Sequence, residues 1–350
     1  MKITDAGKVV MAGFAGTRVD EQVRELLKLG VSGFILFARN IESSEQTKEL
    51  IAEIRSLAAG RRLLFAVDQE GGRVARLREP ATIWPSMRML GNTGDLDAAG
   101  QFGKALGFEL AALGFDLDFA PVVDVDSNSD NPVIGDRSFG NNPQRVAEMG
   151  VAVITGLQNA GVAACAKHFP GHGDADKDSH RELPLIPHDR RRLDNVELPP
   201  FVAAVEAKVA AVMTAHILVE AIDAQWPATM SAKVLSILRE DLAFDGVIVT
   251  DDLEMKAIAD NYDVGEAAVR AAAAGADLML ACKDFHHQEN VVRALFDGHM
   301  SGKLPPLRLD EMQRRLEKMA LRFPPTAGDL SVLGRDEHQQ LAELIRSRGA

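Results

Sequence analysis

Short apolar runs alternate with segments of helical periodicity along nearly the whole chain. The runs are continuous rather than alternating, which is typical of strands buried on both faces of a parallel sheet. They lie at residues 9–14, 33–37, 63–68, 116–122, 162–168, 210–216, 246–251 and 277–282. Helical segments follow them at residues 21–29, 44–57, 95–113, 143–160, 193–208, 231–242, 264–274 and 288–296. This pattern predicts one α/β domain, a single TIM-type (β/α)8 barrel.

An open, doubly wound sheet is the rival arrangement of the same units. Eight regular units in roughly 300 residues favour closure. No Gly-x-Gly-x-x-Gly follows a strand at the start of a helix, so the usual reason for a dinucleotide fold is missing. We expect residues 1–300 to form the catalytic barrel. Residues 301–350 should be a helical extension packed on its outside, with helices at 308–322 and 336–348 and no second sandwich domain.

Charge and apolar content narrow the classes of partner. The 350 residues include 51 acidic and 39 basic ones, giving a net charge of −12. Nucleic acid and anionic membranes need a basic field, so neither is expected as a partner. The apolar run at residues 9–14 is too short for a signal peptide, and no stretch approaches the ~20 apolar residues of a membrane span. We therefore expect a cytoplasmic protein, and a monomer, in which Cys165 and Cys282 are buried thiols.

Polar side chains gather where the predicted strands end. These ends carry Asp68, Asp124, Lys167, His168, His216, Asp251 and Asp252, whereas the opposite ends are mostly Gly, Ala and Leu. Barrel enzymes build their sites at the C-terminal strand ends. The sequence therefore predicts a site at this rim.

The loop after the fifth strand, residues 167–180, is the most polar of these ends. It holds a lysine, three histidines, several aspartates and three turn-forming Gly or Pro residues. Ionisable groups at the mouth of a strand cost desolvation energy unless the site uses them. Gly171 and Gly173 lead us to expect that this loop can move.

Four motifs in order carry a resemblance to a known family. They are Asp-Gln-Glu-Gly-Gly-Arg-Val at 68–74, Asn-Pro-Val-Ile-Gly-x-Arg-Ser-Phe-Gly at 131–140, Lys-His-Phe-Pro-Gly-His-Gly at 167–173 with Asp-Ser-His at 178–180, and Thr-Asp-Asp-Leu-x-Met at 250–255. Together they resemble the family 3 glycoside hydrolases, and more narrowly their single-domain β-N-acetylglucosaminidases. The resemblance implies a cofactor-free exo-enzyme acting on a small saccharide or muropeptide in which N-acetylglucosamine is linked to (anhydro-)N-acetylmuramic acid, as in cell-wall recycling.

The same resemblance implies a retaining mechanism with a named set of residues. Asp251 would be the nucleophile, His180 the general acid and base, and Asp178 the group that orients His180. A retaining enzyme needs one ionised carboxylate and one proton donor, and histidine titrates near neutrality. Binding of the terminal sugar would fall to charged side chains that hydrogen-bond its hydroxyls. By the match these are Asp68, Arg76, Arg137, Lys167 and His168.

Structural interpretations stand beside these roles. Asp251 could cap a helix, although we assign that place to Asp252, and choosing between them rests on the resemblance alone. His180 could be a solvated loop residue, and His172 fits a loop-shaping role better than chemistry. Arg76 and Arg137 could be partners in structural ion pairs.

Other functions remain open on the sequence. The histidines and aspartates of residues 168–180 could bind a metal, but their spacing matches no familiar ligand pattern, so we expect none. A phosphorylase of the same family is the nearest alternative, since a histidine at position 180 repels phosphate less than a carboxylate would. A β-glucosidase and a barrel that binds sugar without cleaving it are the others.

Overall fold

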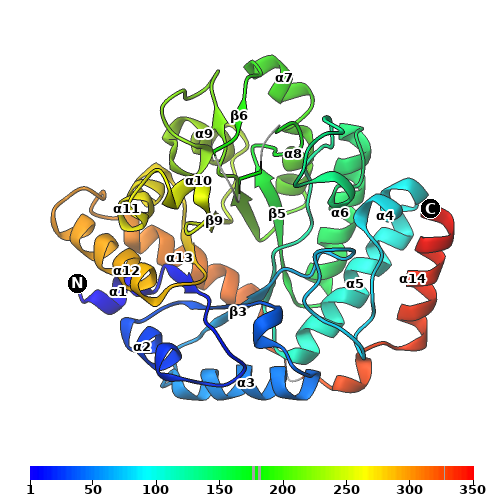
Figure 1. Cartoon of the computed structure of the whole chain (residues 1–350), viewed down its shortest axis with the longest axis horizontal. Coiled ribbons are helices and arrows are strands. Elements are labelled where there is room, and N and C mark those ends of the chain that lie inside the picture. Colours follow the sequence, from blue (N-terminus) through cyan, green and yellow to red (C-terminus); the bar gives the residue numbers. More distant parts are fainter. Residues whose placement is uncertain (176–177, 180–182, 327) are drawn as a thin grey trace.

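Eight parallel strands close into a barrel in the computed structural model (Figure 1). The structure describes residues 1–175, 178–179, 183–326 and 328–350. In order around the barrel the strands are β1 (Val10–Ala12), β2 (Gly33–Leu36), β3 (Leu64–Val67), β4 (Leu117–Asp118), β5 (Ala163–Phe169), β7 (Ala211–Thr214), β9 (Val247–Asp252) and β10 (Leu278–Ala281). The first strand pairs with the last, with Val10 opposite Met279. This pairing confirms the closed barrel and excludes the open sheet.

Helices surround the barrel and fall close to the predicted segments. They are α1 (Ile3–Gly7), α2 (Glu21–Leu29), α3 (Ser44–Leu57), α4 (Met87–Thr93), α5 (Leu96–Leu113), α6 (Pro143–Asn159), α7 (Arg190–Asn195), α8 (Pro199–Glu206), α9 (Ala232–Ser236), α10 (Lys256–Ala259), α11 (Val264–Ala274), α12 (Phe285–Met300), α13 (Arg308–Arg322) and α14 (Asp336–Gly349). Three predicted segments, 21–29, 44–57 and 264–274, match their helices residue for residue.

Local capping explains this agreement. The Ser43 hydroxyl accepts the N–H of Gln46 at the start of α3, and the Asp263 carboxylate accepts the N–H of Glu266 at the start of α11. Helix α2 ends at Gly30, which has a positive φ of 91°. These signals act within a few residues, so the sequence alone predicts where the helices begin and end.

Three predicted elements are wrong in part. The helix expected at 193–208 is two helices, α7 and α8, because Pro199 lacks an N–H and can only begin a helix. The helix expected at 231–242 continues beyond α9 as a π-helical turn at Ile237–Asp241. The fourth strand is shorter than predicted because Pro121 interrupts its ladder, although the N–H of Val123 still donates to the carbonyl of Lys167.

A small second sheet was not predicted. Strand β6 (Leu185–Ile186) follows the loop after β5, and strand β8 (Leu218–Val219) follows β7. The two strands pair in parallel, with Leu185 opposite Leu218. Strands of two residues carry no periodicity, so no pattern in the sequence could reveal them.

Buried charges also lie at the N-terminal ends of the strands, where we expected few. Asp277 precedes β10 and binds Arg239 and Arg308. Asp116 precedes β4 and binds Arg55 of α3. Each carboxylate also accepts the N–H of a neighbouring strand, so these groups join helices to strands.

The two C-terminal helices pack on the outside of the barrel, as predicted. Helix α13 meets the barrel through Arg308, and α14 lies along α4 and α5 at the right of Figure 1. The division of the chain at residue 300 into domain and extension stays a prediction.

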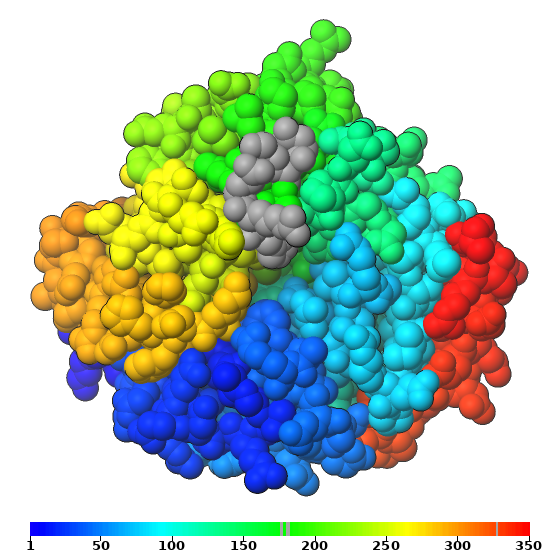
Figure 2. Space-filling view, viewed as in Figure 1, coloured from blue at the N-terminus to red at the C-terminus, as the bar shows by residue number. Residues whose placement is uncertain are grey.

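Segments that are far apart in the sequence meet on one face of the molecule. Figure 2 shows segments from the first third of the chain, from its middle and from the 250s around the centre of this face. Within the described ranges, no helix combines the length and apolar character needed to cross a bilayer.

Candidate active site

One cavity of about 320 Å³ lies at the C-terminal ends of the barrel strands. Seven of the eight predicted site residues line it, namely Asp68, Arg76, Arg137, Lys167, His168, Asp178 and Asp251. They come from four separate strand–loop units and meet only because the barrel closes. The eighth, His180, lies outside the described residues.

A buried network of charges holds the basic side chains of the cavity. The Lys167 ammonium lies 2.9 Å from Asp68 and 2.6 Å from Glu70. The Arg137 guanidinium binds both oxygens of Glu70, each at 2.8 Å. Such a bidentate pair fixes the plane of the guanidinium as well as its position. Glu70 therefore orients both Lys167 and Arg137.

Mutual pairing keeps these groups ionised in spite of their burial. Burial alone would raise the pKa of the Glu70 carboxyl, but the charges of Arg137 and Lys167 outweigh it and hold that pKa well below its usual range. Burial alone would lower the pKa of Lys167, but Asp68 and Glu70 raise it. The pKa of Arg137 is raised for the same reason, chiefly by Glu70. Glu70, Lys167 and Arg137 therefore keep their charges at physiological pH.

Asp124 performs a similar task for the backbone and ring of His168. Its carboxylate lies 2.7 Å from Nδ1 of His168 and accepts the backbone N–H of His168 at 3.1 Å and of His172 at 2.7 Å. Because a carboxylate only accepts, Nδ1 of His168 carries a proton. Nε2 then turns toward Arg137, 3.5 Å from its guanidinium. Burial alone would raise the pKa of Asp124, but the charge of His168 and the hydrogen bonds from His168 and His172 outweigh burial, so the pKa is lowered.

His172 lines the cavity but is almost fully buried, with 2% of its surface exposed. Its Nε2 lies 3.0 Å from the hydroxyl of Ser179. Burial and the nearby His168 lower its pKa to about 4, so the ring is neutral at physiological pH. A Cβ at Gly173 would lie 1.8 Å from the carbonyl oxygen of Val125. Close packing, rather than freedom to move, therefore explains the glycine at 173.

Asp68 and Arg76 form the half-buried edge of the cavity. The Arg76 guanidinium lies 3.2 Å from the second oxygen of Asp68, while the first oxygen binds Lys167. Arg76 also donates its backbone N–H to the side chain of Gln69. Both readings of the arginines hold: Arg76 and Arg137 form ion pairs and line the cavity.

Two adjacent carboxylates end strand β9. The backbone N–H of Asp252 donates to Asp251 at 2.8 Å. The Asp252 carboxylate accepts the N–H of Glu254 at 3.1 Å and of Cys282 at 3.2 Å. Asp252 is therefore not the helix cap that we expected, because α10 begins after Met255. It joins β9 to the end of β10 instead.

Sequence reasoning assigned no role to Glu70 or Asp124. Both are fully or almost fully buried carboxylates beside strand ends, at 2% and 0% exposure. The sequence did indicate where both residues lie, because Glu70 belongs to the first motif and Asp124 to the predicted rim of strand ends. Their partners were not, since Arg137 and His168 are far away in the sequence.

The donor set of the described residues does not point to a metal. Across the described ranges, no group of three His, Cys, Asp or Glu side chains is placed to hold an ion. Cys282 lines the cavity as a buried free thiol, and Cys165 is also a buried free thiol, as predicted. The absence of a metal and of a cofactor stays a prediction.

The arrangement can bind a polyhydroxylated molecule beside the carboxylate of Asp251. Asp68, Lys167 and Arg137 offer acceptors and donors at fixed positions. Asp251 lines the same cavity from strand β9, which lies across the barrel from β3. Charge-assisted hydrogen bonds of this kind discriminate strongly against ligands that lack the matching hydroxyl.

Curated relatives carry related names. Beta-hexosaminidase of Pseudomonas aeruginosa is 42% identical over 313 residues, 87% of this chain and 90% of the relative. Beta-hexosaminidase A of Pseudoalteromonas piscicida is 36% identical over 94% of this chain. The chain spans only 61% of the length of that second relative.

Solved structures and a family model agree with these relatives. A family 3 β-N-acetylglucosaminidase from a Paenibacillus species is 41% identical with a TM-score of 0.96, over 100% of this chain and 69% of that one. NagZ from Neisseria gonorrhoeae, in complex with N-trifluoroacetyl-D-glucosamine, is 34% identical with a TM-score of 0.80 over 98% of each chain. The glycosyl hydrolase family 3 N-terminal domain model matches residues 4–319. The chain therefore belongs to glycosyl hydrolase family 3, as its four motifs indicate.

Proposed function

We propose that the protein is a retaining exo-β-N-acetylglucosaminidase. The observation that best supports this activity is the meeting of Asp251 with Asp68, Arg137, Lys167 and His168 in one cavity. A volume of about 320 Å³ is suited to one terminal sugar rather than to a long chain. The names of the relatives favour an N-acetylhexosaminide, and cell-wall muropeptides with N-acetylglucosamine on (anhydro-)N-acetylmuramic acid are the proposed natural substrates.

In the proposed reaction, Asp251 attacks the anomeric carbon and the bond to the leaving oxygen breaks. His180 gives its proton to that oxygen, so the aglycone leaves as a neutral alcohol. His180 then takes a proton from water, whose oxygen displaces Asp251 and releases the sugar with its original configuration. Asp178 orients His180 in both steps.

The charged network gives the first step its geometry. Sugar hydroxyls would bind the side chains of Asp68, Arg76, Arg137, Lys167 and His168. Glu70 already holds Lys167 and Arg137, and Asp124 holds His168. Asp68 and Arg76 hold each other. Because these side chains are already in place, less conformational entropy is lost when the sugar is oriented for the reaction. No cofactor takes part, and we place the enzyme, as a monomer, in the cytoplasm.

Release of nitrophenol from its β-N-acetylglucosaminide tests the proposal. Asp251→Asn should lower kcat by roughly 10³-fold or more, because the covalent intermediate cannot form. Asp136→Asn is the matched control, since Asp136 pairs at the exposed rim with Arg73 and should keep full activity. Dialysis against a chelator should leave the rate unchanged. An Asp251→Asn enzyme as active as the control would refute the assignment.

A phosphorylase is the second candidate, favoured by one feature of the cavity. Arg39, Arg73 and Lys283 line it in addition to the cations paired with Glu70. Arg39 donates to the carbonyl oxygens of Phe14 and Cys282, so its hydrogen bonds leave the charge available to an anion. Added phosphate would then raise the rate and yield N-acetylglucosamine 1-phosphate. Free N-acetylglucosamine at a rate independent of phosphate is expected for the hydrolase.

A further inference from the structure

We propose that Trp226 and Tyr262 are positioning residues for the loop after β5. Their stacked rings would hold together the two elements that anchor this loop, and so place Asp178 and Ser179 opposite Asp251. The inference rests on the proposed function, because it gives the loop its part in the reaction. Neither aromatic residue lines the cavity of about 320 Å³.

The first anchor joins the loop to helix α10. The carbonyl oxygen of Ser179 accepts the N–H of Ala257 at 3.3 Å, and Ala257 is fully buried. Helix α10 ends just before Tyr262, whose N–H donates to the carbonyl of Ile258 at 2.8 Å. Helix α10 therefore connects Ser179 of the loop to Tyr262.

The second anchor is the small sheet that the sequence did not reveal. Strand β6 lies on the far side of the loop and pairs with β8, where the N–H of Leu218 donates to the carbonyl of Pro184 at 2.9 Å. The chain then turns through Asp223, whose carboxylate accepts the N–H of Gln225 at 3.0 Å. Trp226 follows directly, so β8 connects the other side of the loop to the indole ring.

The two rings close this chain of contacts. The ring centroids of Trp226 and Tyr262 are 5.7 Å apart with an angle of 35° between the planes. The guanidinium carbon of Arg270, on α11, lies 3.3 Å from the centroid of the Trp226 ring. A cation above an indole ring strengthens a half-buried stack. The stack therefore links β8 to the end of α10, and both sides of the loop are tied to it.

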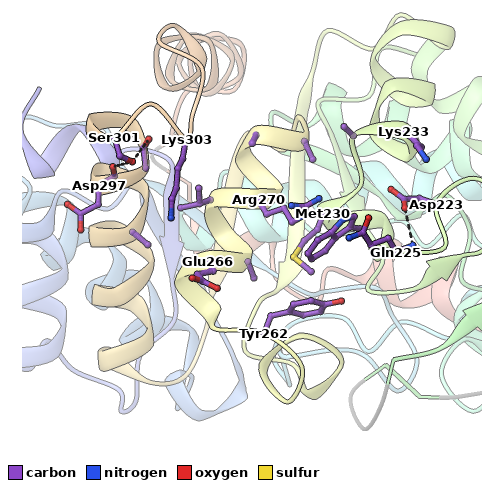
Figure 3. Close-up of a pocket in the computed structure, with 18 residues that line it drawn as sticks. Asp223, Gln225, Met230, Lys233, Tyr262, Glu266, Arg270, Asp297, Ser301 and Lys303 are labelled. Atoms are coloured by element: carbon purple, nitrogen blue, oxygen red, sulfur yellow. Dashed lines mark hydrogen bonds between the residues drawn. The ribbon is translucent and has the colours of Figure 1, made fainter.

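The stack uses residue types that are rare in this chain. It contains one tyrosine and two tryptophans in all. The pair lines a second cavity, of about 770 Å³, together with Asp297, Ser301 and Lys303. Figure 3 shows Arg270, Met230 and Tyr262 on one side of α11 and Lys303 on the other. Lys303 thus shares the cavity but not the stack, which makes it a matched control.

Substitutions of the two rings should separate kcat from KM. Trp226→Leu and Tyr262→Leu are each expected to lower kcat about 10-fold while KM changes less than about 2-fold, because Asp68, Arg137 and Lys167 are held by a separate network. Tyr262→Phe keeps the ring and should keep kcat. Lys303→Ala should match the wild type.

A comparison of two leaving groups distinguishes positioning from simple loss of folded protein. Nitrophenol leaves without much help from an acid, whereas an alkyl or sugar alcohol needs the proton. The Leu variants should therefore lose several times more rate on the alkyl β-N-acetylglucosaminide than on the nitrophenyl one. Loss of folded enzyme would lower both rates equally, and Tm measures that contribution separately.

Two results would overturn the inference while leaving the proposed function intact. One is wild-type kcat on both substrates in Trp226→Leu and Tyr262→Leu. The other is an equal loss on both substrates that Tyr262→Phe does not restore. Failure of the proposed function looks different, since the wild type would not hydrolyse either substrate or Asp251→Asn would remain active.

Discussion

Each buried charge of the site has a partner at the scale of single residues. Glu70 is 2% exposed and pairs with two cations, and removing one member of such a group leaves the others uncompensated. The sequence showed the glutamate but not its partners, which arrive from the loops after β4 and β5.

Glu70→Gln should therefore lower both stability and sugar binding. The variant keeps the shape but leaves Lys167 and Arg137 with less negative charge, so we expect a loss of about 3 kcal/mol in the free energy of unfolding and a rise in KM. The pKa of Glu70 is lowered in the fold, so its contribution is full above the unfolded value and is lost as pH falls below it. Denaturant unfolding at pH 7 and pH 4 measures this.

Asp136→Asn is again the control for Glu70→Gln, because its pair with Arg73 is half-exposed. Exposed pairs contribute at most about 1 kcal/mol. If the two variants unfold at the same denaturant concentration, Glu70 does not organise the site.

Asp252 gives a stability effect of the opposite sign. Burial and the negative charge of Glu254 raise its pKa to about 7. The folded carboxyl keeps its proton up to that pH, while the unfolded one releases it near 3.8, the ordinary pKa of an aspartate. The free energy of unfolding therefore falls as pH rises between these values.

Asp252→Asn removes this penalty, because a neutral amide oxygen can still accept the N–H groups of Glu254 and Cys282. The variant should be more stable than the wild type at pH 8, and the difference should shrink toward pH 5. Thermal unfolding across that range measures it. A difference that is constant with pH would show that Asp252 does not titrate there.

Local signals decide the elements, and α3 is the clearest case. Its cap, Ser43, accepts the N–H of Gln46 at 3.1 Å. Ser43→Ala should lower the free energy of unfolding by about 1 kcal/mol. Ser56→Ala is the control on the same helix, because its exposed hydroxyl donates to the carbonyl of Glu53 and caps no helix start. Equal stability of the two variants in urea would contradict a capping role.

Elements that depend on distant partners were less visible. The pair β6 and β8 has two residues on each strand and exists because the loops after β5 and β7 lie side by side. Pro199 in the sequence indicates the break between α7 and α8, but the apolar residues around it continue the helical pattern and led to the prediction of one helix. Periodicity is thus a good guide to long elements and a poor one to short ones.

At the scale of the whole molecule, a buried carboxylate helps to join the C-terminal helix to the barrel, beside contacts such as that of Asn92 with the carbonyl of Gly349. Glu109 of α5 accepts the N–H and hydroxyl of Thr82, the N–H of Gly334 and Nδ1 of His338 on α14. It therefore joins a barrel helix, a loop and the tail. The sequence predicts that α14 is a helix, but not what it binds.

Glu109→Ala should lower the free energy of unfolding by about 3 kcal/mol, because several buried donors lose their acceptor. KM for the nitrophenyl substrate should not change, since Glu109 does not line the cavity of the site. Glu148→Ala, an exposed residue of α6, is the control. A large rise in KM without loss of stability would contradict a purely structural role.

The sequence by itself determined the order and type of the eight barrel units, because strands and helices follow from spacing and capping within a few residues. It also determined which strand ends carry polar groups. Only the tertiary structure decided which of those groups meet. Strand order brings Glu70 to Arg137 and Lys167, and Asp124 to His168. Burial and Coulomb energy depend on such distances through space, which no local pattern encodes.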